Sequence, residues 1–148
     1  MKQIFLVILC MFFIPSFVHA GGGKPLENKY VKCDIALQQK HLKAGTTAHV
    51  LITFTPIAGI HVNGKPAMEI KIDSTNSIAA VGKPEIPLSK KTGYVESRKQ
   101  IRVPFTLAKD LKSGPFSITG TLTYYYCSDA DGWCSRYKQP ISLTTVVQ

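Results

Sequence analysis

Apolar and polar residues alternate one for one along most of the chain. In residues 31–37, for example, every second side chain is apolar, and Cys33 lies in the apolar phase. Further runs of this kind cover residues 48–54, 68–72, 101–107, 116–126 and 141–147. A period of two is typical of half-buried β-strands. Short stretches at residues 60–62 and 77–81 are candidates for one or two more.

Helical periodicity never persists beyond about one turn, near residues 107–111, and Gly or Pro interrupts the pattern repeatedly. Six to eight short antiparallel strands predict an all-β fold. Their number and spacing favour an immunoglobulin-like antiparallel β-sandwich over a closed barrel. We expect a single domain that covers residues 30–148.

The N-terminal residues have the pattern of an export signal. Lys2 precedes an almost unbroken apolar run over residues 4–18, and small residues lead up to Ala20. This pattern predicts a secretory signal peptide at residues 1–20, followed by a flexible segment at 21–29 that begins with three glycines. The alternative, an uncleaved membrane anchor, is less favoured because the run is shorter than the ~20 residues that span a bilayer.

Composition then limits the function classes. The chain has 148 residues with 45% hydrophobic and 18% charged residues, which excludes wholesale disorder and a large multidomain enzyme. Cleavage after Ala20 removes Lys2 and Cys10, so the net charge falls from +9 to +8 and three cysteines remain. Exported cysteines occupy a compartment in which disulfides persist, and three suggest one pair and one leftover.

A basic concentration in one part of the chain has two interpretations, a solvated face or a surface for an acidic partner or anionic membrane. It comprises Lys83, Lys90, Lys91, Arg98, Lys99 and Arg102. Nucleic acid is not expected as a partner, because aromatic platforms are not interleaved with these charges.

The most informative segment carries two cysteines on either side of a six-residue polar turn. Cys127 ends one strand-like run and Cys134 begins the next. Neighbouring antiparallel strands lie close enough for a disulfide, so a Cys127–Cys134 bond is geometrically natural. Closing this eight-residue ring stabilises the fold by about 2.5 kcal/mol in the chain-entropy model.

The same bond has two possible roles, a structural staple or a redox site. A disulfide at a loop tip is open to thiolate attack, and Trp133 with three preceding tyrosines offers an apolar wall around it. Asp129 and Asp131 argue the other way, because carboxylates near the sulfurs disfavour the attacking thiolate. The residues alone leave both roles open.

The hairpin resembles the end of the N-terminal periplasmic domain of the thiol:disulfide interchange protein DsbD. The resemblance is carried by the run of residues 120–127, the Gly132-Trp133-Cys134 triplet and the strand at 140–143. Upstream, residues 42–45 leading into the 50–54 strand, and 59–63 before the 68–72 strand, are similar to another part of that family. The similarity extends over roughly residues 30–145, although only the cysteine hairpin is a specific motif.

This resemblance implies an immunoglobulin-like sandwich whose dithiol, Cys127 and Cys134, carries electrons between periplasmic partners through mixed disulfides. It also places His61 and Asn63 near positions where the family has aromatic residues beside its site. Two features depart from the family. Residues 87–93 lack the acidic, Phe-bearing cap loop, and the turn between the cysteines is one residue longer. Without a C-x-x-C motif or a membrane domain in this sequence, we expect the electrons to come from a separate membrane thiol reductase.

Other candidate sites have plainer interpretations. Cys33 is predicted to be a buried, inert thiol, with a reactive or dimer-forming thiol as the alternative. His41, His49 and His61 lack mutual metal-ligand spacing, and the Asp-Ala-Asp-Gly run at 129–132 is predicted to be a turn and not a calcium loop. No hydrolase or phosphate-binding motif is present, so neither metal nor cofactor is expected.

The sequence therefore predicts an exported, periplasmic thiol–disulfide exchange domain that uses Cys127 and Cys134. Its expected partners are proteins with disulfides or thioredoxin-like domains. The alternative is a non-enzymatic basic binding module of the cell envelope, in which the same bond is only structural.

Overall fold

The computed structural model describes residues 27–73 and 75–148, which form nine strands and no helix. The strands are β1 (Val31–Leu37), β2 (His41–Leu42), β3 (Thr47–Pro56), β4 (Ile60–Val62), β5 (Glu69–Ile72), β6 (Ile78–Val81), β7 (Gln100–Leu107), β8 (Gly114–Ser128) and β9 (Trp133–Val147). The predicted signal peptide at 1–20 and most of the predicted flexible segment lie outside the described residues. Within the described part, no helix is long and apolar enough to cross a membrane.

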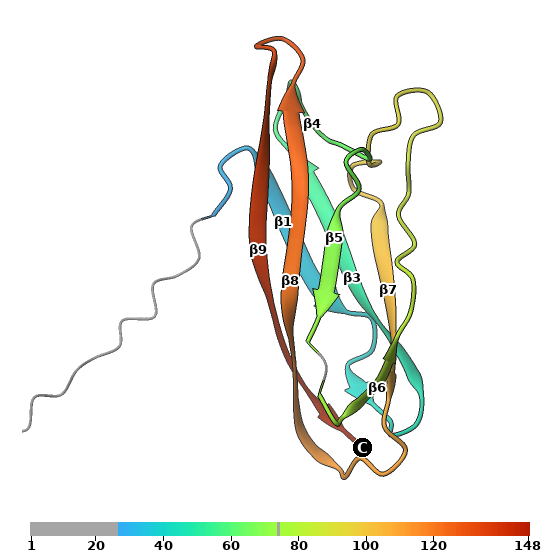
Figure 1. The fold of residues 1–148 in the computed structure, drawn as a ribbon. Helices are drawn as coiled ribbons and strands as arrows, with labels where there is room; N and C mark the ends of the chain where they lie inside the picture. The colour runs from blue at the N-terminus through green and yellow to red at the C-terminus, as the bar shows by residue number, and fades with distance from the viewer. Residues whose placement is uncertain (1–26, 74) are drawn as a thin grey trace, which may run out of the picture.

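Two sheets pack face to face, which confirms the predicted all-β, immunoglobulin-like sandwich. One sheet has the order β1-β3-β7-β6, and the other has the order β2-β9-β8-β4, with β5 also paired to β8 (Figure 1). The shared core comes from the apolar phases of the strands. Phe54 of β3 meets Tyr124 of β8 across the sandwich, with their ring centroids 4.7 Å apart. The alternation in the sequence thus sorts core from surface correctly.

The strands depart in two respects from the six to eight short antiparallel ones that the sequence predicts. β8 and β9 form one hairpin with 15 residues in each strand, paired from Gly114↔Val147 to Ser128↔Trp133. The sequence does not predict the first half of β9, because exposed residues and Pro140 interrupt its pattern. Most of β9 is an edge strand, where exposed side chains and a proline are tolerated. In addition, the two-residue β2 pairs in parallel with the end of β9, and it is too short to show periodicity.

The hairpin brings distant parts of the chain together at one end of the sandwich. Figure 1 shows the β8–β9 turn, β4 and part of the long β6–β7 connection at this end, whereas the C-terminus lies at the other. Backbone hydrogen bonds fasten this assembly: Asn63 N donates to Tyr125 O at 2.8 Å, and Val95 N donates to Val62 O at 2.9 Å. The predicted cysteine pair lies at this junction.

Candidate functional site

The hairpin turn places the two cysteines directly opposite each other. Cys127 and Cys134 are register partners joined by a disulfide, with their Cα atoms 4.1 Å apart. The strands continue past the cysteines to Ser128 and Trp133, so the turn contains four residues and not the six expected. Gly132 supplies the positive φ of 68° that closes the turn, and its N–H donates to Ser128 O at 3.0 Å. The pairing predicted from the sequence is therefore confirmed.

The disulfide lies on the outer face of its sheet. Even-numbered residues of β8, such as Tyr124, point into the core, so Cys127 belongs to the opposite phase. On β9 the phases are reversed, and Cys134 also faces outward. Even so, Cys127 is only 4% exposed, whereas Cys134 is an exposed residue. The two cysteine residues thus differ greatly in exposure.

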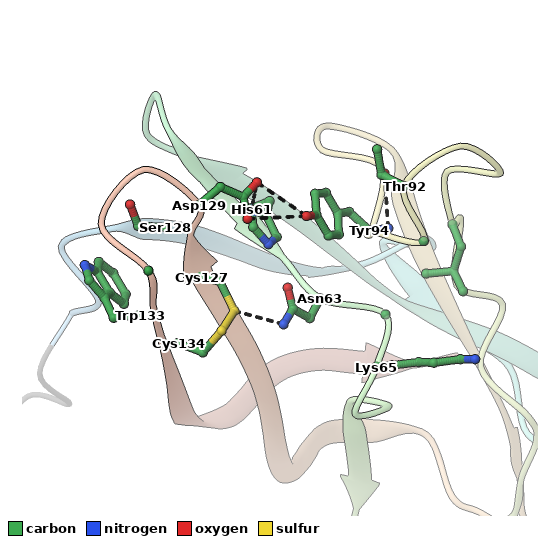
Figure 2. Close-up of a pocket in the computed structure, with 14 residues that line it drawn as sticks. His61, Asn63, Lys65, Thr92, Tyr94, Cys127, Ser128, Asp129, Trp133 and Cys134 are labelled. Carbon is green, nitrogen blue, oxygen red and sulfur yellow. Dashed lines mark hydrogen bonds and ion pairs between the residues drawn. A yellow bond between two sulfur atoms is a disulfide. The ribbon is translucent and has the colours of Figure 1, made fainter.

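Cys127 is buried because β4 and the residues after it cover this part of the outer face. His61 is the register partner of Cys127 in the neighbouring strand. Two residues further on, Asn63 Nδ2 donates a hydrogen bond to Cys127 Sγ at 3.0 Å (Figure 2). Asn63 Oδ1 is also buried and has no hydrogen-bond partner among the described residues. The Asn63 side chain thus holds an amide N–H donor beside the Cys127 sulfur.

An aromatic pair lines the same pocket as the disulfide. The His61 and Tyr94 rings are stacked with centroids 3.6 Å apart. Tyr94 Oη donates to the Asp129 carboxylate at 3.4 Å, and His61 Nδ1 lies 3.5 Å from Asp129 Oδ2 (Figure 2). Desolvation, followed by the negative charge of Asp129, raises the pKa of Tyr94. The pair links β4, the β6–β7 connection and the hairpin turn.

Residues 87–93 belong to the long β6–β7 connection. This connection packs closely on the segment after β4. The approach is so close that a Cβ at Gly64 would overlap the Gly93 carbonyl and the Leu88 side chain. Leu88 and Tyr94 of this connection therefore line the disulfide pocket. Residues 87–93 contain no carboxylate pair and no Phe.

The sequence singles out residues 87–93, which include Leu88, only as lacking a cap loop, and it gives no signal for Tyr94. Tyr94 reaches the site through the β-bridge Asn63↔Tyr94, its stack on His61 and its hydrogen bond to Asp129.

The resulting pocket is open and has a volume of about 630 Å³. Both cysteines line it, with His61, Asn63 and Tyr94 on one side and Trp133 on the other (Figure 2). Of the aromatic residues expected to form a wall, only Trp133 takes this position. Its ring packs edge-on against Tyr126, with centroids 5.9 Å apart, while Tyr124 lies in the core.

The two carboxylates of the turn are held by other groups. Asp129 is engaged by Tyr94 and His61, as described above. Asp131 accepts a hydrogen bond from Ser128 Oγ at 2.7 Å within the turn. The Asp-Ala-Asp-Gly run is thus the hairpin turn, as predicted. No cluster of three or more potential metal ligands occurs in residues 27–73 and 75–148.

The remaining sulfur, Cys33, lies on the other sheet. It is half-buried rather than fully buried as predicted, and it packs against the core from β1. Burial, followed by the charge of Asp34, raises the pKa of its thiol to about 12. The thiol is therefore protonated at neutral pH, which supports the interpretation of an inert thiol.

Two of the six cations in the basic concentration from Lys83 to Arg102 have acidic partners within the chain. Lys99 forms an ion pair with Glu96, and Arg102 Nε lies 3.8 Å from Glu85 Oε2. Arg102 Nη2 also donates to Gln38 Oε1 at 2.9 Å. Part of this charge is thus neutralised within the chain.

Comparison with known proteins adds little beyond the fold. No protein-family model and no curated protein sequence matches the chain. Among solved structures, it resembles the yeast GGA1 GAE domain (12% identity, TM-score 0.44), covering 79% of this chain and 93% of that one. It also resembles the reduced DsbD N-terminal domain of Neisseria meningitidis (18% identity, TM-score 0.40), covering 80% of this chain and 90% of that one. At TM-scores this low, function must be argued from the disulfide and its surroundings.

Proposed function

We propose that this protein is a thiol–disulfide exchange domain of an oxidising compartment, the periplasm, and that Cys127 and Cys134 pass electrons between partner proteins. The observation that carries the proposal is that the two bonded cysteines differ in exposure and in hydrogen bonding. Cys134 is exposed in an open pocket, whereas Cys127 is buried and receives a hydrogen bond from Asn63. A structural staple needs no such difference.

This inequality assigns a role to each sulfur. An incoming thiolate reaches Cys134 Sγ, and the Cys127–Cys134 bond breaks with Cys127 leaving as a thiolate. The Asn63 N–H favours this leaving group, because a hydrogen bond to the charged form lowers its energy and better leaving groups depart faster. A mixed disulfide between the partner and Cys134 results.

The second thiol of the partner completes the transfer. It attacks the partner's own sulfur in the mixed disulfide and releases Cys134, so that two electrons have moved from the partner's dithiol to this chain. In the next half-reaction, the Cys134 thiolate attacks a client's disulfide, and Cys127 resolves the new mixed disulfide. The client leaves as a dithiol, and the Cys127–Cys134 bond is restored. We infer that the donor is a separate membrane thiol reductase and that the clients carry disulfides or thioredoxin-like domains.

Trapping experiments test this assignment. In a Cys127→Ser variant the resolving sulfur is missing, so mixed disulfides with partners should accumulate on Cys134 and be visible on non-reducing gels. The matched Cys134→Ser variant should accumulate far fewer, because Cys127 is covered. Absence of adducts from both variants, together with a reduction potential far below about −300 mV, where structural bridges lie, would overturn the proposal. That result would favour the alternative of a basic binding module with a structural disulfide.

A further inference from the structure

The outer face of the hairpin continues beyond the disulfide as a row of cations. Side chains two residues apart on a strand share a face, so Arg136 and Lys138 of β9 lie in line with Cys134. At about 3.4 Å per residue, their Cα atoms lie roughly 7 and 14 Å from that of Cys134. All three residues are exposed.

A groove of about 530 Å³ follows this row. Its lining includes Arg136, Lys138, Lys71 and Tyr125, and Tyr125 is the register partner of Arg136. Tyr125 comes two residues before Cys127 on β8 and therefore lies on the same outer face. The groove and the disulfide pocket thus occupy one continuous face of the same hairpin.

The charges on this face are unbalanced. Neither Arg136 nor Lys138 forms an ion pair with any described residue. The nearby carboxylate of Glu69 is already engaged by Lys71 Nζ at 2.8 Å, so a single acid serves the three cations of the groove. This face therefore carries a net positive charge, which an acidic partner would complement. In the other basic region, Lys99 and Arg102 have acidic partners within the chain, whereas none of the ion pairs of the described residues involves the remaining four cations.

We propose that this row, defined as Arg136 and Lys138 with Tyr125 beside them, docks an acidic polypeptide segment next to the partner's reactive cysteine. The inference deepens the proposed function, on which it rests, by specifying the partner: in an extended segment, carboxylates two and four residues from the cysteine would meet the two cations. The spacing matches because both chains advance by the same length per residue. Such contacts mainly accelerate encounter and select among partners.

The docking surface can be tested separately from exchange of the native disulfide. In a Cys127→Ser background, the Cys134 thiolate attacks a peptide cysteine activated with 5-thio-2-nitrobenzoate, and the released chromophore reports the rate. Three peptides would carry Glu, Gln or Lys two and four residues after the cysteine. At low salt we expect the Glu peptide to react about 10-fold faster than the Gln peptide and the Lys peptide to react more slowly. The preference should shrink at high salt.

Charge reversal provides the decisive comparison. Arg136→Glu with Lys138→Glu should abolish or invert the preference. The control, Lys43→Glu with Lys112→Glu, changes the net charge equally but lies next to the β2 and β8 ends that pair with Val147, far from the disulfide, and it should retain the preference. Neutral dithiodipyridine measures the intrinsic reactivity of Cys134 in each variant. The milder Arg136→Gln with Lys138→Gln pair covers any folding defect of the reversal.

Equal rates for the three peptides, or equal effects of both charge reversals, would overturn the docking surface while leaving the exchange proposal intact. Conversely, failure of trapping in cells with the peptide preference retained would refute exchange and leave the docking surface standing. Binding to phosphatidylglycerol vesicles that depends on Arg136 and Lys138, without any peptide preference, would identify a membrane surface and also overturn the proposal.

Discussion

Two cysteines in this protein lie in the same kind of secondary structure but differ in the surroundings that decide their reactivity. Cys33 and Cys134 both lie on β-strands at a sheet edge. Cys33 packs against the core beside Asp34, and its thiol pKa is raised to about 12. Cys134 is exposed and bonded to Cys127, whose sulfur accepts a hydrogen bond from the Asn63 amide. The comparison shows that side-chain surroundings, and not residue type or secondary structure, separate an inert thiol from a candidate exchange site.

The largest effect should come from removing the hairpin pair. The Cys127→Ser, Cys134→Ser double variant should lose all exchange with dithiothreitol, because no other disulfide occurs among the described residues. Its free energy of unfolding, measured in urea, should fall by about 2.5 kcal/mol from the loss of an eight-residue ring. As the control, Cys33→Ser should leave the exchange rate unchanged. Exchange that survives in the double variant would contradict the assignment of the site.

The second-largest effect is expected for the alkylation rate of Cys33, which depends on the fraction of its thiol that is ionised. With a pKa of about 12 in place of 9.0, the native thiol at pH 8 is about 10³-fold less ionised than in the unfolded chain. Alkylation by iodoacetamide should be slower by a similar factor in native protein than in urea. Since a raised pKa keeps the proton on sulfur, the native rate should continue to rise between pH 9 and pH 11, where the unfolded rate levels off. The free Cys134 of a Cys127→Ser variant should react quickly, and similar rates at the two sites would remove the contrast between them.

The smallest effect is expected when the hydrogen bond to Cys127 is removed. Asn63→Ala should slow reduction of the disulfide by dithiothreitol about 10-fold, because a hydrogen bond to a charged group contributes roughly 1.5 kcal/mol or more. Asn28→Ala is a matched control, since that amide donates to Tyr124 Oη at 3.0 Å and not to a sulfur. The control should change stability without changing the reduction rate. If both variants are reduced at the wild-type rate, Asn63 is not a positioning residue for the leaving group.

Much of the fold could be predicted because alternation reports directly which side of a strand is buried. Ile101, Val103 and Phe105 show the strict pattern, and all are in the core. Prediction failed for segments that are mostly exposed or too short to show a period. The first half of β9 carries exposed Arg136 and Lys138, and β2 is too short to show a period, so neither has a detectable signal.

The candidate site, too, could be predicted only in part from the sequence. The cysteine pairing followed from local geometry, since a hairpin brings its two strands together whatever surrounds them. The resemblance placed His61 and Asn63 beside the site, but it did not predict their contacts. Tyr94 was missed because it is 33 positions before Cys127 in the chain and reaches the pocket through a non-local bridge.

The sequence by itself determined the alternating strands, the hairpin disulfide and the separation of Cys33 from the other two cysteines. All of these depend on residues that are neighbours along the chain or across one turn. Only the tertiary structure decided which sulfur is covered, which amide contacts it and which cations remain unpaired beside it. The first two properties arise where β4, the β6–β7 connection and the hairpin meet, and the third arises where the hairpin lies beside β5. Contacts between such distant segments leave no periodic signal in the sequence.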